Sequence, residues 1–212
     1  MRTMIAIPCM DMVHTGFMTS LIGLNRVGEI QLSIVTQSLI YDARNELAIK
    51  AIQGGCDRIL WIDSDMRFAP DTLERLSADM DATGCDAVAG LFFKRTLPTE
   101  PVIYSRLDYY PDAPQSERIK IETAKDYPKD TLFQVGGFGF GCVLTTTQIV
   151  KDVWDKCKIP PFLPELGMGE DMSFCWRVSQ IGGKMYCDSA VKVGHIGQIE
   201  FNERTWLAQN RG

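Results

Sequence analysis

The sequence predicts an α/β protein built on a doubly wound, mostly parallel sheet. Strand-like and helix-like segments alternate through residue 93. The apolar run at residues 59–62 is typical of a strand buried on both faces. Helical periodicity stops at glycines, as at Gly54 and Gly84. This alternation places helices on both faces of a parallel sheet.

The first part of the chain supplies the regular elements. Strands are expected at residues 3–10, 29–37, 57–62 and 85–93, and helices at residues 15–27, 39–53 and 71–83. Asp71 can cap the third of these helices. Ligands of open α/β sheets bind at the carboxyl ends of strands, so residues that follow the strands are the first site candidates.

The second part is less regular and predicts a smaller antiparallel zone. Short strand-like pieces are expected at residues 101–105 and 118–122, followed by the glycine-rich, strand-like run 131–145, a helix at 146–157 and the proline-rich run 158–169. A helix at 170–181 and strands at 184–188 and 191–197 complete the pattern. Nothing repeats, so we expect one domain, residues 1–212, in two zones.

Composition narrows the class of protein. The chain has 212 residues, a net charge of −5 and no block of like charges, which excludes a generic nucleic-acid or membrane-surface binder. Recognition of nucleic acid through a local patch stays open. The seven scattered cysteines are typical of a reduced, intracellular protein. No apolar run approaches 20 residues, so we expect a cytoplasmic protein without integral membrane association.

Two aspartates raise the main question. Asp63 and Asp65 sit one residue apart directly after the apolar strand 57–62. Neighbouring carboxylates repel unless protons or a cation neutralise them, and a hard divalent ion could also bridge to a ligand's phosphates. The alternative is a loop with two solvated acids.

Three further motifs carry candidate side chains. Glu170 and Asp171 open a helix, where a carboxylate could act as a general base or only compensate the helix dipole. His195 lies between glycine and isoleucine in "VGHIG" and could bind a metal. Arg44 precedes the Asp63 strand and could bind a phosphate or a base, or be an ordinary surface arginine.

The glycine-rich run and the tail complete the candidates. Glycines at residues 135–142, Gly139 among them, could let a sugar lie against the backbone or could mark a β-bulge. The run is not a Rossmann fingerprint. We expect the tail after His195 to close over a ligand through Arg204 or Trp206; a frayed terminus is the alternative.

In this order, the motifs resemble nucleotide-sugar glycosyltransferases of the GT-A fold. "ARNELAIKAIQGGCDRILWIDSDM" resembles the family-2 stretch that ends in DxD. "GMGEDMSFCWRVSQIGGKMYCDSAVKVGH" resembles a segment shared by family-2 enzymes, β-1,4-galactosyltransferases and polypeptide N-acetylgalactosaminyltransferases. The resemblance covers residues 4–93 and 134–196, and it implies a nucleotide-binding half at 1–93 and an acceptor-side half with a lid at 94–212.

The resemblance also implies roles for particular residues. Asp63, Asp65 and His195 would hold Mn²⁺ or Mg²⁺, and Asp171 would be the base of an inverting enzyme, with Glu170 holding the acceptor or the loop. Retaining glycosyltransferases carry the same GED…VGH pattern as inverting ones. Of the two stereochemical outcomes, inversion and retention, we favour inversion. The residues implied or considered for donor binding are Pro8, Cys9, Asp11, Arg44, Asp63, Ser64, Gly139, Arg204 and Trp206.

The resemblance implies that the donor is a nucleoside-diphosphate sugar, and a UDP-sugar is the commonest choice in the family. The acceptor stays open: it can be a glycan, a lipid-linked sugar, a protein or a modified nucleic-acid base. Three other classes of protein are alternatives to a glycosyltransferase. A DxD phosphatase would place its aspartates after the first strand, and a nucleotidyltransferase would need a glycine- and arginine-rich loop there. A non-catalytic binding module of the same fold is the third.

Overall fold

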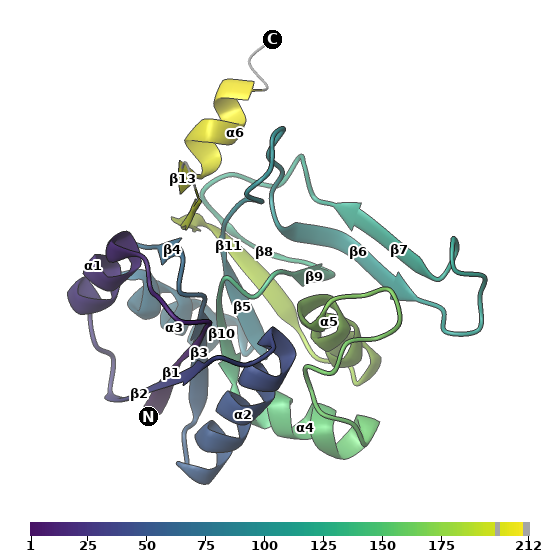
Figure 1. Cartoon of the computed structure of the whole chain (residues 1–212), viewed down its shortest axis with the longest axis horizontal. Helices are drawn as coiled ribbons and strands as arrows, with labels where there is room; N and C mark the ends of the chain where they lie inside the picture. Colours follow the sequence, from purple (N-terminus) through teal and green to yellow (C-terminus); the bar gives the residue numbers. More distant parts are fainter. Residues whose placement is uncertain (198–199, 210–212) are drawn as a thin grey trace.

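A computed structural model describes residues 1–197 and 200–209 (Figure 1). Helices cover a central sheet, and a smaller antiparallel sheet projects from one side. The strands are β1 (Arg2–Cys9), β2 (Glu29–Thr36), β3 (Arg58–Ile62), β4 (Met66–Arg67), β5 (Ala87–Leu91), β6 (Ile103–Tyr109), β7 (Ile119–Thr123), β8 (Leu132–Gln134), β9 (Gly137–Phe138), β10 (Cys142–Thr146), β11 (Met185–Lys192), β12 (Gly194–Ile196) and β13 (Glu200–Phe201). The helices are α1 (Thr15–Gly23), α2 (Ile40–Gln53), α3 (Thr72–Thr83), α4 (Thr147–Cys157), α5 (Glu170–Gln180) and α6 (Glu203–Gln209).

The central sheet has the strand order β2-β1-β3-β10-β5-β11-β8. Strands β2, β1 and β3 are parallel to one another, as are β5 and β11. Strands β10 and β8 run antiparallel to their neighbours. The predicted mostly parallel α/β sheet is therefore confirmed.

Helices pack on both faces of this sheet, as the alternation predicts. Strand β1 shows how this arises, because Met4 and Ala6 belong to the core under α2, α4 and α5. Ile5 and Ile7, the residues between and after them, belong to the core under α1 and α3. Successive strand residues point to opposite faces, so both faces must be apolar.

The glycine-rich, strand-like run at residues 131–145 is not one continuous strand. The run forms three short strands, β8, β9 and β10, in two different sheets. Strand β10 inserts antiparallel between β3 and β5, so those two strands do not pair. Glycines break the run where the backbone packs closely: a Cβ on Gly136 would lie 2.9 Å from the Ser105 oxygen.

Helix α1 is shorter than expected. It ends at Gly23 rather than near residue 27, and the backbone at Leu24 is extended. The other expected helices agree with the structure to within one residue. Gly84, which ends α3, has a left-handed φ of +62°, a conformation that favours glycine.

Two small sheets complete the fold. Strands β7, β6 and β9 form the antiparallel sheet that projects from the body, which confirms the smaller antiparallel zone (Figure 1). Strands β13, β12 and β4 form the other. No helix in the described part of the chain combines the length and apolar character needed to cross a bilayer.

Candidate active site

The turn after β3 carries Asp63 and Asp65, and its backbone is fixed at three points. The Asp63 N–H donates to the Gly141 oxygen at 3.1 Å, and the Met66 N–H donates to the Asp63 oxygen at 3.1 Å. The Ile196 N–H donates to the Asp65 oxygen at 2.8 Å. The turn is therefore tied both to the central sheet and to β12.

Pairing of β12 with β4 brings His195 to this turn. His195 lies opposite Met66 in that pair, and its Nε2 is 3.5 Å from Asp65 Oδ2. Its Nδ1 lies 2.9 Å from the Phe93 carbonyl oxygen. A carbonyl oxygen only accepts hydrogen bonds, so Nδ1 carries a proton and Nε2 is left to face Asp65.

Arg44 joins two acidic residues from distant parts of the chain. Its Nη2 donates to Asp63 Oδ1 at 2.8 Å, and its Nε donates to Glu170 Oε1 at 3.3 Å. Only 2% of its side chain is exposed, and its Cζ lies 5.4 Å from the centre of the Phe140 ring. Arg44 is therefore a buried residue of the site, and the surface-arginine alternative is wrong.

The two aspartates of the turn have opposite electrostatic environments. Burial raises the pKa of Asp63, although the charge of Arg44 opposes this effect. Burial also acts to raise the pKa of Asp65, but contacts of its carboxylate with His195 and Arg95 outweigh it and lower the pKa. Asp65 therefore has the more stable negative charge of the pair.

Asp171 lies across the site at the start of α5. Burial and then the neighbouring Glu170 raise the pKa of Asp171 to about 6, against a hydrogen bond from the Met172 N–H. A Cβ on Gly139 would lie 3.5 Å from Asp171 Oδ2. Gly139 thus brings the backbone close to a carboxyl group whose pKa suits a general base.

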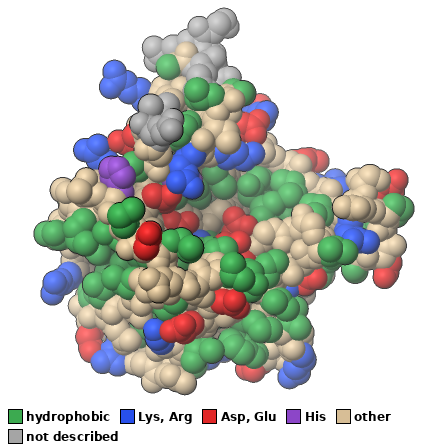
Figure 2. Space-filling model, viewed as in Figure 1, with side chains coloured by type: hydrophobic (Ala, Val, Ile, Leu, Met, Phe, Trp, Pro, Cys, Tyr) green, Lys and Arg blue, Asp and Glu red, His purple; other side chains and the backbone are tan. Residues whose placement is uncertain are grey.

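These residues line one continuous opening made of two hollows. The first is lined by Pro8, Cys9, Met10, Ser38, Ser64 and Asp65. The second, of about 630 Å³, is lined by Arg44, Gly139, Glu170 and Asp171. Asp63, Arg95, His195 and Ile40 line both. In Figure 2, acidic and basic side chains surround a hollow near the middle of the face shown.

The donor set fits a divalent cation in part. Asp65 Oδ2 and His195 Nε2 lie 3.5 Å apart, and the Phe93 carbonyl orients the imidazole. Mg²⁺ and similar ions are commonly held by one or two protein groups together with substrate phosphates. Across residues 1–197 and 200–209, no group of three His, Cys, Asp or Glu side chains is arranged for a metal. The three-residue set with Asp63 stays a prediction.

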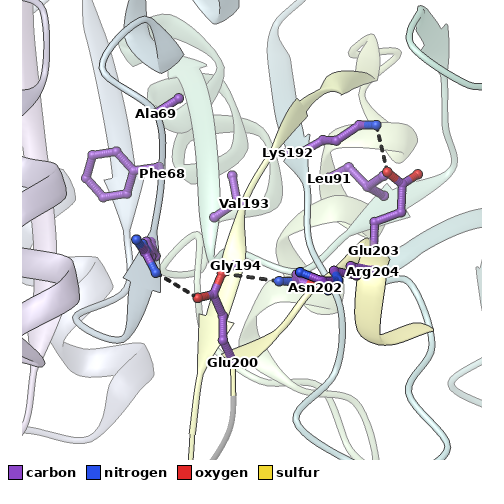
Figure 3. A pocket seen from close by; sticks show the side chains of 11 residues that line it. Phe68, Ala69, Leu91, Lys192, Val193, Gly194, Glu200, Asn202, Glu203 and Arg204 are labelled. Atoms are coloured by element: carbon purple, nitrogen blue, oxygen red, sulfur yellow. Dashed lines mark hydrogen bonds and ion pairs between the residues drawn. The ribbon is translucent and has the colours of Figure 1, made fainter. Parts of the chain in front are cut away.

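Three expected donor-binding residues lie outside this cleft. Asp11 is exposed and does not line either hollow. Arg204 lines a separate hollow with Arg67, Lys192 and Glu200 (Figure 3). Trp206 packs on Phe93 and Tyr127, with ring centres 5.7 and 6.0 Å away.

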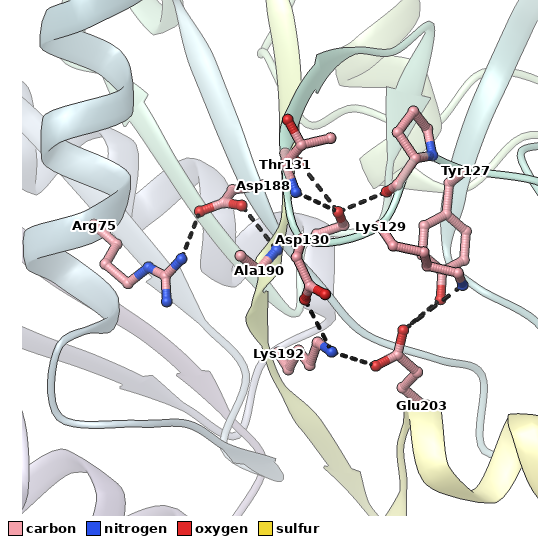
Figure 4. A network of polar contacts seen from close by, with 11 residues as sticks. Arg75, Tyr127, Lys129, Asp130, Thr131, Asp188, Ala190, Lys192 and Glu203 are labelled. Atoms are coloured by element: carbon pink, nitrogen blue, oxygen red, sulfur yellow. Dashed lines mark hydrogen bonds and ion pairs between the residues drawn. The ribbon is translucent and has the colours of Figure 1, made fainter.

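The expected C-terminal lid is a docked helix in this structure. Asn202 Oδ1 accepts from the Thr205 N–H at the start of α6. Glu203 contacts Lys192 at 2.7 Å and accepts from the Tyr127 hydroxyl at 3.0 Å (Figure 4). The frayed-terminus alternative is wrong for residues 203–209; residues 198–199 and 210–212 of the expected lid lie outside the described residues.

Sequence reasoning missed Lys94 and Arg95. Both follow β5, and Arg95 Nη1 lies 2.7 Å from Asp65 Oδ2. Two cations directly after a buried parallel strand were the available signal, since the carboxyl ends of parallel strands meet at the ligand-binding edge. His14 also lies at this edge, where its N–H donates to the Ser64 oxygen at 3.3 Å.

Comparisons with known proteins identify the fold. No family model matches the chain, and no curated protein matches its sequence. The structure is similar to A197 from STIV, with 21% identity and a TM-score of 0.67, over 93% of this chain and 86% of that chain. It is also similar to GalNAc-T7 solved with UDP, GalNAc and Mn²⁺, with 14% identity and a TM-score of 0.62. That match covers 93% of this chain and 44% of the GalNAc-T7 chain. The chain therefore has the GT-A-like fold of glycosyltransferases, as its motifs predict.

Proposed function

We propose that this protein transfers a sugar from a nucleoside-diphosphate sugar to an acceptor hydroxyl with the help of a divalent cation. The observation that carries the proposal is the convergence of Asp65, His195 and Asp171 on one cleft from β3, β12 and α5. Likeness to GalNAc-T7, solved with a nucleotide, a sugar and Mn²⁺, supports the same class of donor.

The nucleotide half of the donor is assigned to the hollow beside β1. Pro8, Cys9 and Ser64 line it and would contact the nucleoside, a uridine in our proposal. Asp63 would contact the ribose or the metal shell, with Arg44 holding its carboxylate in place. Asp65 and His195 would hold Mn²⁺ or Mg²⁺, which would stabilise the negative charge on the departing diphosphate.

The acceptor is assigned to the hollow beside α5. The sugar would lie against the backbone at Gly139, next to Asp171. Asp171 would take the proton from the acceptor hydroxyl, as an inverting reaction requires, and its raised pKa of about 6 suits that role. Glu170, held by Arg44, would fix the loop or the acceptor. The acceptor can be a glycan, a lipid-linked sugar, a protein or a modified nucleic-acid base.

Nucleotide release tests the proposal. The protein is incubated with a panel of UDP-sugars, Mn²⁺ and candidate acceptors, and release of UDP is measured. We expect release by the wild type and at least a hundredfold loss, an order-of-magnitude figure, in Asp65→Ala and in His195→Ala. The melting temperature, measured with Mn²⁺ and each of several nucleotides in turn, ranks the nucleotides by affinity, because a ligand that binds only the folded state raises its stability.

The matched control is Asp112→Asn, which changes an exposed carboxylate in the turn before β7. This variant should release UDP as fast as the wild type. Release that is equal in all four proteins would reject the assignment of Asp65 and His195. Tight UDP binding without turnover on any acceptor would instead favour a non-catalytic binding module.

A further inference from the structure

Arg95 contacts the carboxylate oxygen that also faces His195. Its Nη1 lies 2.7 Å from Asp65 Oδ2, and His195 Nε2 lies 3.5 Å from the same oxygen. A divalent cation held between Asp65 and His195 would need the negative charge that Arg95 now neutralises. The guanidinium and such a cation would therefore compete for Asp65.

The position of Arg95 is central to the cleft. It lines both the hollow beside Pro8 and Ser64 and the hollow beside Gly139 and Asp171. The diphosphate of a donor must lie between its nucleoside and its sugar, so it would cross this junction. Guanidinium groups bind phosphate oxygens through paired, charge-assisted hydrogen bonds.

The local structure lets the side chain move without unfolding its loop. Half of the Arg95 side chain, 49%, is exposed. The loop after β5 is held by Lys94, the residue before Arg95, and not by Arg95 itself. The Lys94 backbone N–H donates to the Glu100 carbonyl oxygen at 2.9 Å, and Lys94 Nζ lies 3.0 Å from Glu100 Oε2. Lys125 contacts Glu100 as well, at 2.6 Å. In the described part of the chain, the ion-pair partner of Arg95 is Asp65.

We propose that Arg95 is a further donor-binding residue: it neutralises Asp65 in the ligand-free protein and turns to the diphosphate when a divalent cation binds Asp65. This inference rests on the proposed function for its diphosphate step. It makes two predictions of opposite sign. Removal of the guanidinium should strengthen binding of the cation alone and weaken binding of nucleotide in the presence of the cation.

Calorimetric titrations of the full chain test both predictions. Mn²⁺ alone is titrated into the wild type and Arg95→Gln, and UDP is then titrated at saturating Mn²⁺. We expect the Kd of Mn²⁺ to fall about threefold in the variant, the scale of one half-exposed ion pair. We expect the Kd of UDP to rise about tenfold, the scale of one charge-assisted hydrogen-bonding group.

Arg67→Gln is the matched control. Arg67 is an exposed arginine on β4 whose partner is Glu200, and it lines a different hollow (Figure 3). This variant should leave the Kd of Mn²⁺ and the Kd of UDP unchanged. Thermal melting curves of the wild type and both variants are the test that each protein is folded. Electron paramagnetic resonance of Mn²⁺ provides a second measure of the free cation concentration.

The outcomes separate the inference from the proposed function. Unchanged Mn²⁺ affinity in Arg95→Gln, or no Mn²⁺ binding by any of the proteins, overturns the competition for Asp65. Unchanged UDP affinity overturns the diphosphate step. If no nucleoside diphosphate binds to any protein while Arg95→Gln still binds Mn²⁺ more tightly, the proposed function and the diphosphate step fail and the competition stands.

Discussion

The Arg44 guanidinium donates to Asp63 Oδ1 at 2.8 Å, and only 2% of the Arg44 side chain is exposed. The carboxylate of Asp63 is therefore held by a cation that is buried inside the protein. The same guanidinium reaches Glu170 at 3.3 Å. Its third nitrogen, Nη1, is buried without a hydrogen-bond partner among the described residues. The charges of the cleft are thus arranged around Arg44 before any ligand binds.

Replacement of Arg44 by methionine should therefore destabilise the protein strongly. Asp63 and Glu170 would lose their shared cation, and breaking a buried ion pair by removing one partner costs about 3 kcal/mol or more. Urea denaturation followed by tryptophan fluorescence measures the change in the free energy of unfolding. Arg67→Met, which breaks an exposed pair with Glu200, should cost less than about 1 kcal/mol. Equal losses in the two variants would contradict the structural role of Arg44.

Gly139→Ala should impair the site, because the packing around Gly139 has no room for a side chain. The added Cβ would lie 2.6 Å from Val102 Cγ1 and 3.0 Å from the Phe92 ring, so a packed wall of the cleft must shift. Overpacking of this kind typically costs about 1–3 kcal/mol. The free energy of unfolding and the Kd of UDP-sugars at saturating Mn²⁺ measure the effect.

The control for that substitution is Gly23→Ala at the end of α1. A Cβ there meets no atom within 4 Å, so this variant should match or slightly exceed the wild-type stability. If Gly139→Ala were as stable as Gly23→Ala and bound UDP-sugars as the wild type does, the close packing at Gly139 would not limit the site.

The acids and the histidine of the cleft could be predicted from sequence because each one follows an element that periodicity identifies. Asp63 and Asp65 end an apolar strand, Glu170 and Asp171 begin a helix, and His195 ends the last strand pattern. Elements of a doubly wound sheet bring such ends to one edge. The fold class was predictable for the same reason.

The residues that were missed depend on pairing between distant segments. No local feature of residues 131–145 indicates that β10 would insert antiparallel between β3 and β5. Contacts of Arg95 depend on which strand lies next to β3, since the loop after β5 must reach Asp65. Trp206 likewise fits the core beside Phe93 only after β12 and β13 have paired.

Asp79 and Asp188 should make stability depend on pH. Burial and the neighbouring Asp188 raise the pKa of Asp79 to about 6, and Arg75, 3.5 Å from Asp188, opposes this in part (Figure 4). A carboxyl group with a raised pKa holds its proton more tightly in the folded state. Its contribution to stability is complete below the unfolded-state pKa, near 3.8, and is lost as pH rises through about 6.

Asp79→Asn keeps the shape and removes the titration. The variant should lose less stability than the wild type between pH 5 and pH 8, as measured by urea denaturation at both values. Asp112→Asn, in an exposed turn, should retain the wild-type difference. A wild-type pH dependence that persists unchanged in Asp79→Asn would show that another group causes it.

The proposed base should give the transfer rate a rising pH profile. Asp171 must be ionised to accept a proton, and its pKa in the ligand-free protein is raised to about 6, so kcat/KM should increase with pH through about 6 and then level off. Asp171→Asn should lower kcat by about 10²–10⁴-fold and flatten this limb. A variant that keeps both the rate and the profile would leave Asp171 without a catalytic role, as a retaining reaction allows.

Glu203→Gln should loosen the C-terminal helix. The carboxylate of Glu203 contacts Lys192 and Lys129 and accepts from Tyr127, which together stabilise the docking of α6 by about 1–2 kcal/mol. Arg204, the next residue, is exposed and offers a trypsin site within α6. Cleavage after Arg204 should be several times faster in the variant, since a protease acts on the undocked form.

Glu117→Gln, which changes an exposed residue in the turn before β7, is the control and should be cleaved at the wild-type rate.

The same trypsin assay tests whether the C-terminal tail closes over the donor. If it does, UDP with Mn²⁺ should protect Arg204 in the wild type, because a closed lid undocks less often. Cleavage at the same rate with and without UDP and Mn²⁺ would mean that α6 is a fixed part of the fold, held by Glu203 whether or not the cleft is filled.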